Sequence, residues 1–194
     1  MAAQTAGLVE RSQITMIVTE RLNRYARAVD RCDWDGVRDC YCPDAFDNHG
    51  RYQGDIDGLI ADMQRRHPDL DAVMHLITNV IVDVVSADAV LAESYCLAFA
   101  RHREPESSGR QLLLTTRNRF LDKLVPCADG EWRIKSRVVV MDEVTRTEVT
   151  DTRPPEAAWS QRDRTDLLWE YLEAGAEWDA RRVAEEARVA GKPS

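Results

Sequence analysis

With 194 residues, the chain has the length of one domain, or of one domain with an appendage, and its formal net charge of −8 argues against nucleic-acid binding. Its 44% hydrophobic and 31% charged residues are typical of a soluble globular protein and exclude a disordered or fibrous one. We interpret the acidic balance as a contribution to solubility.

The first residues, the apolar runs and the cysteines all favour a cytoplasmic location. Residues 1–8 contain no basic segment followed by an apolar one, so no secretion signal is expected. Apolar runs such as residues 138–141 are far shorter than the roughly 20 residues of a membrane span. The odd number of cysteines, with no second ligand pair at suitable spacing, predicts reduced thiols rather than disulfides or a metal site. The five are Cys32, Cys40, Cys42, Cys96 and Cys127.

The first part of the chain is predicted to be mainly helical. Apolar residues recur every three or four positions over residues 9–32, which is the period of an amphipathic helix. Asp33 is expected to cap a short second helix, and residues 45–52 are interpreted as an irregular strand. A third helix is predicted over residues 56–66, stopped by Pro68.

The following part is predicted to form long antiparallel strands. Four stretches rich in β-branched residues are separated by turn and loop compositions. They cover residues 74–85, 90–101, 112–125 and 131–142. Helices followed by hairpin-linked strands indicate an α+β fold, in which a strongly curved sheet wraps round the first helix and encloses a cavity.

The end of the chain differs in character from the rest. A polar, proline-containing stretch follows Val144, and residues 162–189 are predicted to be helical. Trp159, Trp169 and Trp178 indicate that this tail docks on the barrel mouth or on a neighbouring subunit. We therefore expect a barrel domain over residues 8–144 and a largely helical C-terminal extension over residues 145–194.

Two polar residues lie where the pattern calls for apolar ones. Asp30 continues the apolar face of the first helix, and His75 opens the first long strand. A carboxylate at a core-facing position is costly unless it is paired, and an imidazole is a natural partner. The alternative is a histidine at a strand end and an aspartate at a frayed helix end, with no contact between them.

Five segments in this order resemble the SnoaL-like group of the nuclear-transport-factor-2-like superfamily, which includes scytalone dehydratase, hexachlorocyclohexane dehydrochlorinase and bile-acid 7α-dehydratase. The segments are YARAVD at 25–30, DWD at 33–35, PDA at 43–45, HLITN at 75–79 and GEWRI at 130–134. The resemblance spans about residues 12–142 and implies a cone-shaped α+β barrel. The resemblance does not extend to the tail.

The resemblance also implies site residues. In those enzymes an aspartate of the first helix and a histidine of the sheet form a dyad facing the cavity, and the matching positions are Asp30 and His75. Tyr25 matches a tyrosine of the bile-acid dehydratase, and Arg137 matches a basic residue used by the dehydrochlorinase. Because the dehydrochlorinase has a lysine where this chain has Tyr25, the resemblance favours a hydroxyl or carbonyl group over a halide.

The chemistry that these residues imply needs neither a metal nor an organic cofactor. An aspartate that accepts a hydrogen bond from one imidazole nitrogen leaves the other free to act as a base. His75 would abstract a proton next to a carbonyl, Tyr25 would donate to the developing oxyanion or to a departing hydroxyl, and Arg137 would hold an anionic group. The predicted function is a dehydratase (lyase) or isomerase acting on a small hydrophobic cyclic or polycyclic substrate.

Other interpretations stay open at this point. Tyr25 is alternatively a core tyrosine, and Arg137 a solvated strand residue that shares its face with Arg133 and Lys135 by strand alternation. Residues 47–49 line the cavity mouth or form a polar loop. The whole protein is alternatively a non-catalytic small-molecule-binding protein, or the structural small subunit of a ring-hydroxylating dioxygenase. We expect a homo-oligomer, a trimer more than a dimer, with no membrane or nucleic-acid partner.

Overall fold

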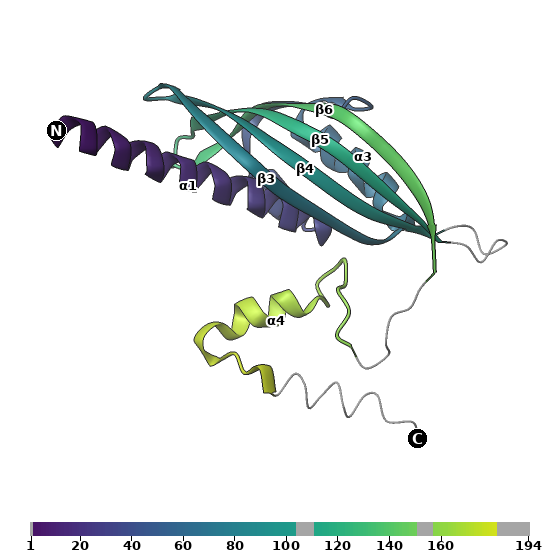
Figure 1. Cartoon of the computed structure of the whole chain (residues 1–194). Helices are drawn as coiled ribbons and strands as arrows, with labels where there is room; N and C mark the ends of the chain where they lie inside the picture. Colours follow the sequence, from purple (N-terminus) through teal and green to yellow (C-terminus); the bar gives the residue numbers. More distant parts are fainter. Residues whose placement is uncertain (1, 104–110, 151–156, 182–194) are drawn as a thin grey trace.

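One curved sheet wraps round the long first helix, and the computed structural model describes residues 2–103, 111–150 and 157–181 (Figure 1). The helices and 3-10 turns are α1 (Ala2–Asp30), α2 (Trp34–Asp39), α3 (Ile56–Arg66), η1 (His67–Asp69), α4 (Leu167–Ala174) and η2 (Gly175–Glu177). The strands are β1 (Tyr41–Asn48), β2 (Gln53–Gly54), β3 (Leu70–Ser86), β4 (Ala89–Arg103), β5 (Gln111–Pro126) and β6 (Trp132–Val149).

The sheet has the strand order β2-β1-β6-β5-β4-β3 and does not close on itself. The strands from β3 to β6 pair as successive antiparallel hairpins, whereas β1 returns parallel to β6. Helix α1 lies across the concave side against β3 and β6. The predicted α+β cone, with helices held inside a curved antiparallel sheet, is therefore confirmed.

The core forms where the apolar stripe of α1 meets the inward side of the sheet. Val18, Leu22, Tyr25 and Val29 recur at helical spacing and are at most 3% exposed. Inward residues of β4, β5 and β6 pack against them, and they include Val90, Cys96, Leu124 and Ile134. Among the described helices, none is both long and apolar enough to cross a membrane.

Several predicted boundaries are confirmed and others are wrong. Helix α3 has the predicted bounds, but β6 runs on to Val149 instead of ending near residue 142. The irregular strand begins earlier, at Tyr41, and includes Pro43. Proline is tolerated there because the pairing of β1 with β6 shifts register between Tyr41 and Phe46, so a ladder hydrogen bond is already missing.

Within the residues that the structure describes, the predicted helix begins at Leu167 rather than at residue 162, and it is interrupted after residue 177. Asp166 caps α4 by accepting a hydrogen bond from the backbone N–H of Leu168 at 3.0 Å, and Gly175 ends the helix with φ of 51°. The η2 turn follows, and residues 180 and 181 are again helical. Residues 182–189, also predicted to be helical, lie outside the described residues.

The tail docks on the end of α1 through the guanidinium of Arg162. This group donates to the carbonyl oxygens of Asp30 (3.2 Å), Val29 (3.4 Å), His67 (3.0 Å) and Leu70 (3.3 Å), and Nη2 lies 2.7 Å from His67 Nδ1. Carbonyls at a helix C-terminus lack partners within the helix, so a cation is well placed among them. Arg162 thus attaches the tail to the C-terminal end of α1, next to Asp30.

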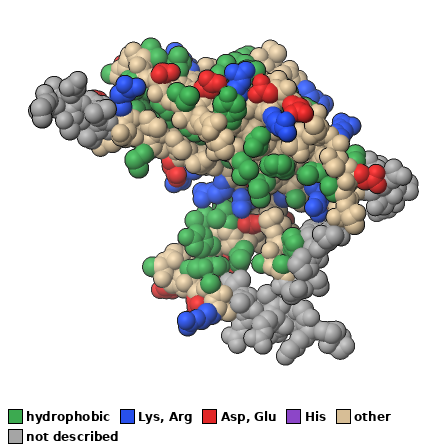
Figure 2. All heavy atoms as spheres, in the orientation of Figure 1, with side chains coloured by type: hydrophobic (Ala, Val, Ile, Leu, Met, Phe, Trp, Pro, Cys, Tyr) green, Lys and Arg blue, Asp and Glu red, His purple; other side chains and the backbone are tan. Residues whose placement is uncertain are grey.

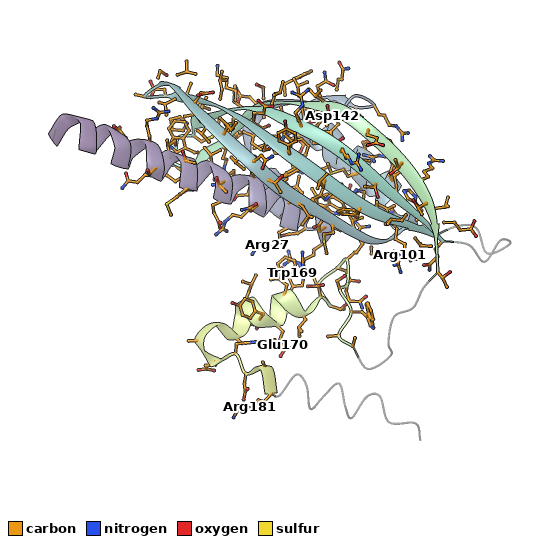
Figure 3. The ribbon with its side chains drawn as sticks, viewed as in Figure 1. Arg27, Arg101, Asp142, Trp169, Glu170 and Arg181 are labelled. Carbon is orange, nitrogen blue, oxygen red and sulfur yellow. The ribbon has the colours of Figure 1, made fainter. Side chains whose placement is uncertain are left out.

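Further ion pairs hold the tail, while the apolar face of α4 stays largely uncovered. Asp166 pairs with Arg31 at 3.1 Å, and Arg164 pairs with Asp33 at 2.9 Å. Asp33 occupies the N-cap position of α2, but its side chain makes no capping hydrogen bond. Trp169 lies on the side of α4 that faces the barrel (Figure 3), and its ring stacks on the guanidinium of Arg164 at 3.9 Å.

Figure 2 shows hydrophobic side chains gathered over this tail. Tyr171 and Leu172 are 49% and 45% exposed, and no residue of α4 is buried. The docking of residues 157–181 therefore combines charged and polar contacts with partial burial of Leu167, Leu168 and Trp169.

The contact of His67 with Arg162 predicts an acid-sensitive stability. Burial, and then the charges of Arg162 and Arg66, lower the pKa of His67 from 6.5 to about 3. Below pH 6.5 the imidazole of His67 is therefore protonated in the unfolded chain but not in the folded chain. The contribution of this group to stability is fully present above the unfolded pKa and is lost as the pH falls below it. We expect the free energy of unfolding to fall by about 2 kcal/mol through this group between about pH 7 and about pH 4.5.

Urea unfolding at the two pH values measures this loss, and His67→Asn is the matched control. The asparagine carbonyl still accepts a hydrogen bond from Arg162 but does not titrate. The variant should therefore show a smaller pH dependence than the wild type. Equal pH dependence in the two proteins would contradict the prediction.

Candidate active site

Asp30 and His75 form the hydrogen-bonded pair that the sequence predicts. Asp30 ends α1, and His75 lies on β3 opposite Ala98 of β4. Asp30 Oδ1 lies 2.6 Å from His75 Nδ1, and Oδ2 accepts the backbone N–H of the same residue at 3.1 Å. Their side chains are only 12% and 18% exposed. One carboxylate thus holds both the ring and the backbone of the histidine.

This arrangement sets the direction of the imidazole. Because the carboxylate accepts from Nδ1–H, Nε2 carries the lone pair and is the atom able to take up a proton. A carboxylate at a helix C-terminus is disfavoured by the helix dipole, so Asp30 needs cationic or donor partners. His75 supplies them on one side, and Arg162 satisfies the Asp30 carbonyl on the other. The pair can act chemically as a general base.

Tyr25 is buried deeper in the same core, one and a half helical turns before Asp30. Its side chain contacts the rings of Tyr41 and Phe120 edge-on, and its hydroxyl lies 3.4 Å from His49 Nε2. Burial raises the pKa of the phenol well above its usual value, and the nearby Arg137 only partly opposes this. Tyr25 therefore keeps its proton and acts as a donor.

A β-bulge turns Arg137 into the core. Neighbouring residues of β5 pair with Ile134 and Ser136, which leaves Lys135 as an extra residue of β6. The alternation along the strand reverses at this point, so Ile134 and Arg137 are both 0% exposed although they are three residues apart. The interpretation of Arg137 as a solvated residue on the face of Arg133 is wrong for this reason.

Asp122 neutralises the buried guanidinium of Arg137. Arg137 donates from Nε and Nη2 to the two carboxylate oxygens at 2.7 and 2.9 Å, and both side chains are fully buried. The guanidinium also lies 4.3 Å from the ring centre of Tyr25 and 4.1 Å from that of Phe120. Only Nη1 has no hydrogen-bond partner. Arg137 therefore offers one guanidinium nitrogen, Nη1, to a ligand oxygen rather than a free fork.

Two further buried atoms of the inward side of the sheet have no hydrogen-bond partner, namely Ser94 Oγ and Asn118 Oδ1. Ser94 pairs in register with Phe120, and Asn118 with Cys96, so both lie beside Phe120 on the same face. A buried polar atom without a partner costs free energy. These atoms would be satisfied by a ligand that carries several oxygen atoms.

Cys96 connects the two ends of this interior. Burial raises the pKa of its thiol to about 12, with opposing smaller effects from the charges of Arg137 and Asp30. Cys96 pairs in register with Ile77, two residues after His75 on β3, and with Asn118, which alternates with Phe120 and Asp122 on β5. The Asp30–His75 pair and the group round Arg137 therefore lie on the same inward side of the sheet.

Some members of this region were missed by the sequence analysis. Asp122 follows Asn118 and Phe120 at alternate positions of a strand, which is the signal that would have placed it on the inward face. Asp47 and His49 were considered only as a cavity mouth or a loop, but Asp47 is 0% exposed and contacts His49. The alternation in β1 is too irregular to predict this burial.

A surface pocket of about 880 Å³ lies elsewhere, near the turn between β5 and β6. Several of its charged side chains are paired with each other, Arg133 with Asp129 and Lys135 with Asp44. The pocket lining does not include the Asp30–His75 pair. Among the described residues, no three His, Cys, Asp or Glu side chains are grouped to hold a metal ion. We therefore place the candidate chemistry inside the barrel.

Comparisons with solved structures return the same fold. A putative scytalone dehydratase from Novosphingobium aromaticivorans is 18% identical over 80% of this chain and 99% of its own, with a TM-score of 0.60. LinA is 19% identical over 76% of this chain and 98% of its own, with a TM-score of 0.63. The hexachlorocyclohexane dehydrochlorinase LinA-type3 from Novosphingobium barchaimii is 17% identical over 76% and 99%, with a TM-score of 0.62. At these identities the likeness establishes the fold alone.

Among curated proteins, no match was found. The model of the SnoaL-like domain family, in contrast, matches residues 12–138. This match covers more than half of the chain and ends just after Arg137, so it includes all four predicted site residues. The protein therefore belongs to the SnoaL-like domain family.

Proposed function

We propose that the protein is a cofactor-independent lyase or isomerase that removes a proton next to a carbonyl group of a small cyclic or polycyclic substrate. The observation that carries this proposal is the contact of 2.6 Å between Asp30 Oδ1 and His75 Nδ1, with the second carboxylate oxygen holding the backbone of His75. A base oriented in this way is common to enzymes that form enolates.

The reaction begins with transfer of the α-proton of the substrate to Nε2 of His75. The electron pair of the broken C–H bond moves into the carbonyl to give an enolate, and Asp30 stabilises the imidazolium that forms. In a dehydration, the enolate then expels a hydroxyl from the β-carbon while Tyr25 supplies the proton that turns it into water. In an isomerisation, the proton returns to another carbon instead.

The interior round Phe120 supports a substrate with several oxygens. Arg137 Nη1 is a donor, Asn118 Oδ1 is an acceptor, and Ser94 Oγ can be either. The other residues packed round these atoms are apolar, which favours a hydrophobic ring skeleton and strengthens each polar contact by excluding water. We therefore propose an oxygenated ring compound as the substrate class.

A panel of cyclic β-hydroxy ketones, from a single ring to a steroid-sized skeleton, tests the proposal. Each compound is incubated with the protein in D2O, and mass spectrometry measures deuterium at the α-carbon while absorbance measures the conjugated enone. We expect at least one compound to exchange or to lose water with wild-type protein but not with His75→Gln. If compounds bind with equal affinity to both proteins and neither reaction occurs, a binding protein is the better description.

A further inference from the structure

A second aspartate–histidine pair lies beside Tyr25. Asp47 is 0% exposed, and one of its oxygens contacts Nδ1 of His49, while the other accepts the hydroxyl of Tyr41 at 2.7 Å. The backbone holds His49 in place, because its N–H donates to the carbonyl of Tyr52 at 2.9 Å. This pair comes from β1 and the following turn, so it is separate from the Asp30–His75 pair.

The hydrogen bonds of this cluster have a defined direction. Burial opposes the ionisation of Asp47, but the hydrogen bond and charge of His49, the charge of Arg137 and the hydroxyl of Tyr41 outweigh it and keep the pKa of Asp47 below its usual value. The carboxylate therefore accepts from both His49 and Tyr41. The other nitrogen of His49 is then directed to the hydroxyl of Tyr25, at 3.4 Å.

Tyr25 needs such a neighbour if it is to donate a proton. Its side chain is 2% exposed, and burial makes the phenolate costly. His49, in contrast, has a side chain that is 21% exposed and can exchange protons with water. Contacts of this kind also tighten when a ligand fills the site. A path for a proton thus runs from solvent through His49 to the hydroxyl of Tyr25.

We propose that His49, held by Asp47, is a positioning residue that resupplies the proton of Tyr25 during the reaction. This inference rests on the proposed function. As the C–O bond of the substrate breaks, its electron pair stays on the oxygen, which takes the hydroxyl proton of Tyr25 and leaves as water. Nε2–H of the His49 imidazolium returns a proton to Tyr25, and neutral His49 takes up another from solvent. His75 releases the proton of the substrate carbon to solvent, so protons balance.

The first test does not depend on knowing the substrate. The hydroxyl exchange of Tyr25 with solvent is measured from the ¹³Cζ signal of labelled tyrosine in an equal mixture of H2O and D2O. Fast exchange gives one averaged line, and slow exchange gives two lines. We expect one line for wild-type protein and two for His49→Gln, with exchange slowed by about 100-fold because glutamine hydrogen-bonds but does not carry a proton.

Tyr52 is the matched control for this measurement, since its hydroxyl donates to the backbone carbonyl of Asp55 at 2.8 Å rather than to Asp47 or His49. Its line shape should be the same in both proteins. Equal exchange of Tyr25 in wild type and His49→Gln would overturn the relay, whatever the activity of the protein.

The second test uses any cyclic β-hydroxy ketone that the wild-type protein dehydrates. His49→Ala should lower kcat by about 100-fold with little change in KM, and added imidazole should restore much of the rate. Unchanged kcat in His49→Ala, or a loss that imidazole does not restore, would overturn the relay while His75→Gln still reports on the proposed function. If no compound reacts, the proposed function fails, and the exchange of Tyr25 alone decides whether the relay exists.

Discussion

Replacing His75 by glutamine is expected to lower kcat/KM for the dehydration of a cyclic β-hydroxy ketone by about 10²–10⁴-fold. Glutamine keeps a donor within reach of Asp30 but has no atom that takes up a proton, so binding should change much less than the rate. Steady-state kinetics together with direct binding measurements separate the two effects. Equal rates for variant and wild type would remove His75 from the mechanism.

Asp30→Asn is the companion variant. It removes the charge that supports the imidazolium, while its amide still reaches the backbone N–H of His75. We expect a large fall in kcat as well, because a neutral amide no longer selects the productive tautomer. His102, a histidine of the same sheet outside the site, supplies the control: His102→Gln should leave the rate unchanged.

Replacing Arg137 by methionine is expected to lower the free energy of unfolding by about 3–5 kcal/mol. The variant leaves the fully buried carboxyl group of Asp122 without its bidentate partner. Urea unfolding measures this loss. A double variant, Arg137→Met with Asp122→Leu, should recover much of the stability, because well-packed apolar residues often replace a buried ion pair without loss.

The exposed pair of Arg24 and Glu20 is the matched control for that measurement. Its side chains are 55% and 59% exposed at an N–O distance of 2.7 Å. Because solvent screens such pairs, Arg24→Met should cost no more than about 0.5 kcal/mol. Losses of similar size for Arg137→Met and Arg24→Met would mean that the interior pair is solvated.

Arg162 of the tail lies next to the Asp30–His75 pair. Arg162 donates to the carbonyl of Asp30 and at the same time to the carbonyls of Val29 and His67, so one guanidinium ties residues 157–181 to the helix end that carries the aspartate. Tryptophans of the tail predicted that it docks, but the arginine makes the closest described contacts. Tryptophan side chains favour burial of their large apolar surface, so they indicate docking in general. The carbonyls at the end of a helix attract a cation, which explains the contacts of the arginine.

The sequence by itself determined the α+β class, the bounds of α3 and the apolar stripe of α1, whereas it indicated the pairing of Asp30 with His75 only through the resemblance to the SnoaL-like group. The first three features depend on local periodicity, which a single chain displays directly, but the positions of the two polar residues alone left their contact open. The tertiary structure alone decided that Arg137 is buried on Asp122, since one extra residue in β6 reverses the strand alternation without any mark in the sequence. Only the tertiary structure also shows that His49 lies beside Tyr25. Because β1 pairs in parallel with β6, it brings together segments that no local pattern relates.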